Sequence, residues 1–76
     1  MTGKYVEKGY EFTYEVELVT NVGVFTETRS LFIPQDDFDM AMDMSRTFLS
    51  DAEMEEGCNS ARPVSLTPKT RARLKV

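Results

Sequence analysis

Residues 10–20 alternate between apolar and polar side chains, and this pattern restricts the fold more than any other feature of the chain. One face would carry Phe12, Tyr14, Val16 and Leu18, and the other Glu11, Thr13, Glu15 and Glu17. A period of two is that of a β-strand with one buried face. The chain must therefore form a sheet and must supply something to cover its apolar face.

A hairpin over residues 10–33 is predicted next. Asn-Val-Gly at residues 21–23 is a turn signal, and residues 24–33 are rich in β-branched and aromatic side chains. A three-residue loop would place Glu15 opposite Arg29, which is favourable, and Glu17 opposite Glu27, which is not. It would also put Leu31 and Ile33 on the polar face. A two- or four-residue loop would put them on the apolar face. We expect one of these, because burial of a shared face decides register.

An amphipathic helix is predicted over residues 35–56. Pro34 suits the first helical position, acidic residues follow it in the first turns, and Gly57 is a good terminator. At 100° per residue the apolar side chains fall within an arc of roughly 120°. This core-facing stripe consists of Phe38, Ala41, Met42, Ser45, Phe48, Leu49 and Ala52.

The C-terminal segment, residues 62–76, is predicted to be a basic strand or a short helix. Val64 and Leu66 indicate a third strand, whereas Thr67-Pro68 resembles a helix start. We prefer the strand because apolar and basic residues alternate at its end: Ala72, Leu74 and Val76 against Arg71, Arg73 and Lys75. The predicted fold is a single α+β domain over residues 1–76. It is a small two-layer ββαβ structure with a three-stranded, mainly antiparallel sheet and one helix packed on one face.

Charge is distributed unevenly along the chain. All thirteen acidic residues lie between Glu7 and Glu56, whereas five of the nine basic residues follow Gly57. The formal net charge of −4 thus hides two opposed blocks. Such asymmetry is typical of electrostatic partners, either within the fold or outside it.

The composition argues against catalysis and against a metal or other cofactor. The chain has no His, which removes the commonest general base and metal ligand, and its single Cys58 cannot form an internal disulfide. The stretch DDFDMAMDM resembles a calcium loop in its first positions, but Ala41 and Met42 occupy places that an EF-hand reserves for a ligand and glycine. On a helix its three methionines would not converge on a soft ion. We therefore expect a protein that is not an enzyme and that needs no cofactor.

We expect a cytoplasmic location and no membrane contact. No run of residues approaches the ~18 apolar residues of a spanning helix, and the first residues, MTGKYVEKGYEF, lack the apolar core of a signal peptide. A lone thiol is also compatible with a reducing compartment.

The outer face of the predicted helix is the candidate binding surface. Met40 and Met44 lie four residues apart on an acidic background, and methionine is adaptable at binding surfaces. The candidate protein-binding residues are Asp36, Asp39, Met40, Asp43, Met44, Thr47 and Asp51. The expected function is a small non-catalytic interaction module, an adaptor or inhibitor that docks on a larger protein with a basic groove.

Three alternatives stay open. An acidic surface of this kind can mimic the DNA backbone, as in small inhibitors that phages encode, and so block a nucleic-acid-binding enzyme. The basic segment can instead bind nucleic acid through Arg71, Arg73 and Lys75, or pair with the acidic face of the hairpin. Finally, an edge strand of so small a sheet can pair with its copy in a homodimer.

Overall fold

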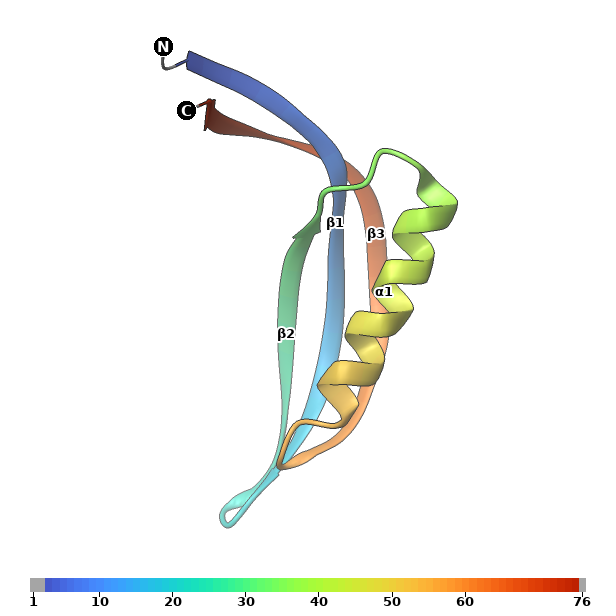
Figure 1. Cartoon of the computed structure of the whole chain (residues 1–76). Coiled ribbons are helices and arrows are strands. Elements are labelled where there is room, and N and C mark those ends of the chain that lie inside the picture. The colour runs from blue at the N-terminus through green and yellow to red at the C-terminus, as the bar shows by residue number, and fades with distance from the viewer. Residues whose placement is uncertain (1–2, 76) are drawn as a thin grey trace.

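Three antiparallel strands and one helix make up this protein, seen in a computed structural model that describes residues 3–75, with side chains described as far as Arg73. The elements are β1 (Gly3–Thr20), β2 (Gly23–Ile33), α1 (Phe38–Glu53) and β3 (Cys58–Lys75). The strand order is β2-β1-β3, and α1 covers one face of this open sheet (Figure 1). The predicted α+β class and ββαβ order are confirmed.

The β1–β2 hairpin turns through the two residues Asn21 and Val22, with Thr20 opposite Gly23. This register pairs Phe12 with Leu31, so the apolar residues of both strands share the face under the helix. The prediction of a shared apolar face is therefore confirmed, in its two-residue form. β1 is longer than expected at its outer end, because it begins at Gly3 rather than at residue 10, whereas β2 ends at Ile33 as predicted.

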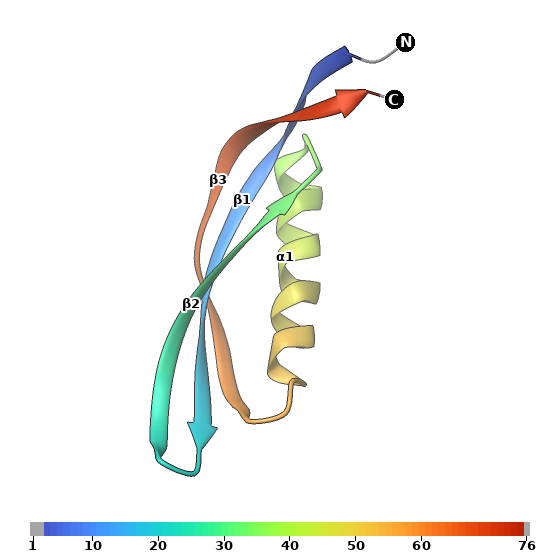
Figure 2. The same ribbon diagram turned by 90° about the vertical axis from the view of Figure 1, so that its left-hand side faces the viewer.

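The C-terminal segment is one continuous strand, so the short-helix alternative is wrong. β3 begins at Cys58, earlier than expected, and pairs with almost the whole length of β1. Beyond the end of β2 the two strands continue as a ribbon, which curves toward the helix side of the sheet (Figure 2). The expected continuation to Val76 lies outside the described residues.

The helix is shorter than predicted at both ends. Asp37, not Pro34, begins it: the Asp37 carboxylate accepts the Met40 backbone N–H at 3.1 Å and caps the first turn. The expected role of Pro34 as first helical residue is therefore wrong, because an acidic side chain three residues later supplies the cap. At the other end Met54 is the C-cap, and Gly57, at φ +82°, forms the turn into β3 instead of ending the helix directly.

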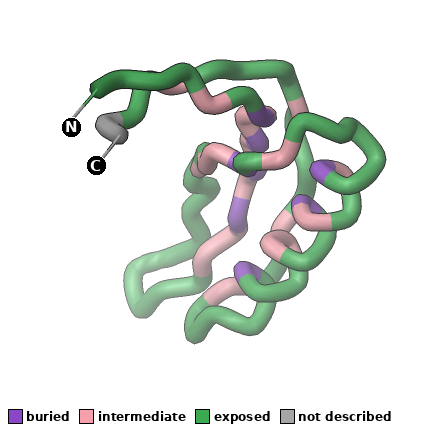
Figure 3. Tube along the Cα trace, turned by 45° about the horizontal axis from the view of Figure 1, so that its top comes forward, coloured by how far each residue is buried: buried purple, intermediate pink, exposed green. Residues whose placement is uncertain are grey.

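The core lies between β1, the end of β2 and the inner side of α1 (Figure 3). Phe12, Val16 and Ile33 are its largest fully buried side chains. Small residues at the centre of the helix face, Ala41 and Ala52 among them, are buried as predicted and let α1 approach the sheet closely. Of the predicted stripe, Met42, Phe48 and Leu49 are half-buried, Ser45 is buried, and Phe38 is exposed near the end of β2, against Tyr10.

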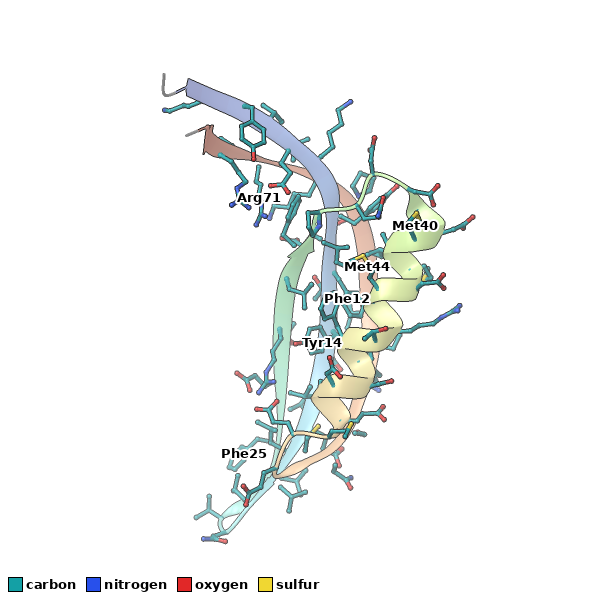
Figure 4. The ribbon with its side chains drawn as sticks, viewed as in Figure 1. Phe12, Tyr14, Phe25, Met40, Met44 and Arg71 are labelled. Atoms are coloured by element: carbon teal, nitrogen blue, oxygen red, sulfur yellow. The ribbon has the colours of Figure 1, made fainter. Side chains whose placement is uncertain are left out.

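Met44 packs against this core, so its predicted place on the outer face is wrong. It lies on the flank of the apolar stripe, and small side chains such as Ala41 and Ser45 occupy the centre of that stripe. A helix that sits this close to a sheet brings the long side chains on its flanks into contact as well. Figure 4 shows Met44 near the sheet and Met40 on the far side of the first turns.

No helix formed by residues 3–75 has the length and apolar character needed to cross a membrane.

Candidate protein-binding surface on the helix side

The sheet face that points away from α1 carries a row of cross-strand polar pairs between β1 and β3. We call it the outer ladder. Arg62 donates to the Glu15 carboxylate at 2.9 and 2.6 Å, and the Asn59 amide donates to Glu17 at 2.7 Å. Its members are Glu7, Glu11, Glu15 and Glu17 of β1 with Asn59, Arg62, Lys69, Arg71 and Arg73 of β3. The basic block after Gly57 therefore neutralises the acidic face of the hairpin within the fold.

Two of the three candidate nucleic-acid-binding residues belong to this ladder. Arg71 donates to Glu7 at 3.0 Å and lies over the ring of Phe32 at 4.2 Å, and Arg73 reaches the same carboxylate at 3.4 Å. The hydrogen bond from Arg71 is the main cause that lowers the pKa of Glu7, against a smaller opposing effect of burial. The third candidate, Lys75, lies in β3, but its side chain is outside the described ones. Arg71 and Arg73 thus face a carboxylate rather than forming an uncompensated basic strip.

The helix side is different, because most of its carboxylates lack a cation. Asp43 meets Arg46 at 3.5 Å, with both side chains exposed, and Glu55 accepts Arg29 at 2.7 Å, which lowers the pKa of Glu55. For the remaining acidic residues of this segment, no ion pair forms among residues 3–73. They are Asp36, Asp37, Asp39, Asp51, Glu53 and Glu56. The uncompensated negative charge of the fold is therefore concentrated on the α1 side.

Six of the seven predicted site residues are exposed, and Met44 is half-buried. Asp36 precedes α1 and lines an open pocket with Lys8 and Lys69 of the sheet. We call the six exposed residues the acidic helix surface: Asp36, Asp39, Met40, Asp43, Thr47 and Asp51. Met40 is the apolar member and is 54% exposed. The Thr47 hydroxyl donates to the Asp43 backbone carbonyl at 3.5 Å, so it is held to the helix. The predicted contact pair Met40–Met44 is thereby reduced to a single exposed methionine.

Two exposed apolar residues at the ends of the helix were not among the predicted site residues. Phe38 is 47% exposed, with its ring edge-on to Tyr10 at 5.7 Å, and Met54 is 84% exposed. Phe38 was assigned to the core because its helical angle is right. That angle takes no account of where the sheet ends, and the first turn of α1 lies at the edge of the apolar face. Met54 is the C-cap, and the helical period places it on the outer face, where it is exposed.

Within residues 3–75 no group of three carboxylates, thiols or imidazoles is placed to hold a metal ion. The Cys58 thiol is half-buried and donates to the Ser60 carbonyl at 3.4 Å. A groove between α1 and β3, about 260 Å³ in volume, is open to solvent and lined largely by apolar side chains such as Met42 and Leu66.

Comparisons with protein-family models, with curated proteins and with solved structures gave no match.

Proposed function

We propose that this chain is a non-catalytic protein-interaction module that docks on a basic surface of a larger protein through the acidic helix surface. The observation that carries the proposal is the segregation of charge. Acids on the outer ladder have cationic or amide partners within the fold, whereas acids such as Asp36, Asp39 and Asp51 form no ion pair among the described residues.

Uncompensated charge on one side of a small domain acts at long range. A concentrated acidic face is attracted to a basic groove and speeds encounter with it, and this effect weakens as salt rises. Met40 supplies an apolar contact on the same side, and methionine adapts its shape to a partner at little cost. The aspartates would then provide steering and orientation, and the methionine short-range contact.

The two nucleic-acid alternatives are not supported equally. Direct binding through the C-terminal strand requires that Arg71 and Arg73 leave Glu7, which competes with any phosphate. Mimicry of the DNA backbone requires only that the partner's basic groove is one that normally holds nucleic acid. We therefore keep DNA mimicry as the second candidate, because it uses the same uncompensated acids.

A cytoplasmic location is part of the proposal. It is supported by the single cysteine, a half-buried thiol that needs no oxidising compartment.

Two matched triple variants test the acidic helix surface. The first replaces Asp39, Asp43 and Asp51 with Asn, and the second replaces Glu11, Glu15 and Glu17 with Gln, so that each removes three negative charges. Affinity capture with the wild-type chain at low and at high salt gives the reference set of partners. We expect the aspartate variant to lose partners whose capture is salt-sensitive, and the glutamate variant to retain them.

Equal retention by both variants, or equal loss with a lowered melting temperature, would contradict the proposal. Adding duplex DNA to the captured complex then separates the two candidates. Release of the partner by DNA indicates a groove that also binds nucleic acid and supports mimicry. Retention of the partner supports a protein-binding module whose site is not a DNA groove.

A further inference from the structure

The two edges of the sheet are unequal. β3, at one edge, contains Pro63 and Pro68, which have no N–H to offer a further strand, as well as several cationic side chains. Prolines and charges of this kind are common protections of an edge against pairing. β2, at the other edge, has no proline, and most of its residues are exposed. The helix packs mainly on β3 and β1, so it leaves most of β2 uncovered, although Ile33 at the end of β2 is buried (Figure 1).

The sequence of β2 is complementary to itself when it is reversed about Thr28. In an antiparallel pair related by a two-fold axis at that residue, each position meets the one equally far on the other side. The pairs between the two copies are Val24 with Phe32, Phe25 with Leu31, Thr26 with Ser30, and Glu27 with Arg29. Apolar residues thus meet apolar ones, hydroxyls meet hydroxyls, and opposite charges meet twice.

Backbone geometry allows the same register. In a hairpin with a two-residue loop, the residues that flank the loop form a hydrogen-bonded pair, and such pairs alternate along the strands. Because Thr20 and Gly23 flank the loop, the odd-numbered residues of β2 direct their N–H and C=O groups to β1. The even-numbered residues, including Thr28, direct theirs to the open edge. A two-fold axis at Thr28 therefore brings free donors opposite free acceptors.

We propose that this chain forms a homodimer by antiparallel pairing of β2 with β2 of a second copy, centred on Thr28. Registers centred on neighbouring residues are worse. An axis at Glu27 or at Arg29 would place that residue opposite its own copy, so that like charges meet. The Thr28 register also gives partners to apolar side chains that one copy leaves in water, such as Val24 at 59% and Phe25 at 51% exposure.

The dimer has one continuous six-stranded sheet in the order β3-β1-β2-β2-β1-β3. Residues opposite each other in a pair project from the same face, so the two helices lie on the same side of this sheet. The acidic helix surface of each copy stays free, because α1 packs mainly on β3 and β1 and the two β2 strands lie between the helices of the two copies. The inference therefore goes beyond the proposed function, uses a different surface, and can be tested without knowledge of any partner.

Charge exchange between copies gives the sharpest test. Sedimentation equilibrium of the wild-type chain from about 1 µM to about 1 mM should show a shift toward twice the 8.7 kDa chain mass. Glu27→Arg alone and Arg29→Glu alone each place like charges opposite one another at two positions, so each should weaken dimerisation about tenfold or more. An equimolar mixture of the two variants pairs opposite charges at both positions and should recover the dimer.

This rescue separates contacts between copies from contacts within a copy. Glu27 and Arg29 also meet within one strand at 3.1 Å, but each variant keeps its own like-charged pair in the mixture. Arg29→Glu also loses the ion pair with Glu55 at 2.7 Å, and this loss likewise persists in the mixture. Net charge does not explain rescue either, because each exchange shifts the formal charge of −4 by two units and both variants stay negative. A wild-type chain that stays monomeric throughout the range, or a mixture that gains nothing over its components, would overturn the proposal.

Disulfide trapping tests the register itself, in a Cys58→Ser background. Thr28→Cys places two thiols in a directly opposed pair with Cα atoms about 5.5 Å apart, within the disulfide range of about 4.4–6.8 Å. Thr26→Cys is the matched control on the same face, since its two copies would lie about 14 Å apart along the strands. We expect rapid oxidation to a covalent dimer for Thr28→Cys, none for Thr26→Cys alone, and restored trapping when Thr26→Cys is mixed with Ser30→Cys. Trapping of Thr26→Cys alone at the rate of Thr28→Cys would refute the register.

Discussion

Replacement of Gly9 by Ala should destabilise the fold through a steric clash at the place where β2 ends. A Cβ atom built on Gly9 lies 2.2 Å from the Ile33 carbonyl oxygen and 2.6 Å from the Phe32 ring. Gly9 is buried, and the Phe32 ring lies across it under the guanidinium of Arg71. The ring can rotate away, but the carbonyl belongs to the backbone and moves only if β2 shifts relative to β1.

The size of the effect follows from two opposing contributions. Overpacking of a well-packed site costs about 1–3 kcal/mol, and a clash with backbone belongs at the upper end of that range. Gly→Ala also restricts the unfolded chain, which stabilises by about 0.4–1 kcal/mol. A net loss of about 2 kcal/mol corresponds to a fall in melting temperature of about 8–16 °C for a domain of this size.

Gly3→Ala is the matched control, because it makes the same change in the same strand and nothing lies within 4 Å of its added Cβ. Urea denaturation followed by circular dichroism gives the free energy of unfolding for both variants and for Gly9→Ala with Phe32→Ala. We expect Gly3→Ala to be neutral or slightly stabilising, and the double variant to remain destabilised because the carbonyl clash persists. If Gly9→Ala were as stable as Gly3→Ala, the argument from close backbone approach would be refuted.

Three further predictions concern single side chains. The pKa of Glu7 is lowered in the folded state. Its contribution to stability is therefore present above the ordinary glutamate pKa of about 4.3 and is lost as the pH falls through the folded value. In urea titrations, the loss of stability between pH 6 and pH 3 should be smaller for Glu7→Gln than for wild type. Met44→Lys should lower the free energy of unfolding by about 1–3 kcal/mol, because Met44 packs on the core. Met40→Lys on the exposed side should change the free energy of unfolding by less than about 0.5 kcal/mol. Equal effects of the two variants in thermal melts would contradict the different placement of these side chains. Asp37→Ala removes the helix N-cap and should cost about 1 kcal/mol, while the neighbouring Asp36→Ala should cost little, and the reverse order in chemical denaturation would contradict the assignment of the cap.

The exposure of the polar residues in the candidate binding surface follows from the sequence better than the exposure of its two methionines, Met40 and Met44. Asp39, Asp43 and Thr47 are exposed on α1, because the helical period places them opposite the stripe. Met44 lies on the border of that stripe, where a small rotation or a closer approach decides between water and core. Approach depends on the small residues Ala41 and Ser45 meeting the sheet, and a helical projection contains no such distance.

The charges show the same division. The sequence predicts two opposed charge blocks, and it leaves open whether the basic block pairs with the acidic face of the hairpin or binds nucleic acid. The alternatives differ only in whether β3 lies beside β1 with Arg62 opposite Glu15, which is a matter of strand order and register. A sequence shows which residues alternate, but it does not show which strand lies next to which.

What the sequence determined by itself is local: the strand period of residues 10–20, the turn after Thr20, an amphipathic helix within residues 35–56 and the opposed charge blocks. These follow from side-chain spacing along one segment, where the backbone period alone places residues on a face. Tertiary structure alone decided which flank of α1 touches the sheet, and that β1 lies between its two neighbours and leaves most of β2 uncovered at an edge. These depend on distances between segments far apart in the chain, which packing sets only when all the elements are brought together.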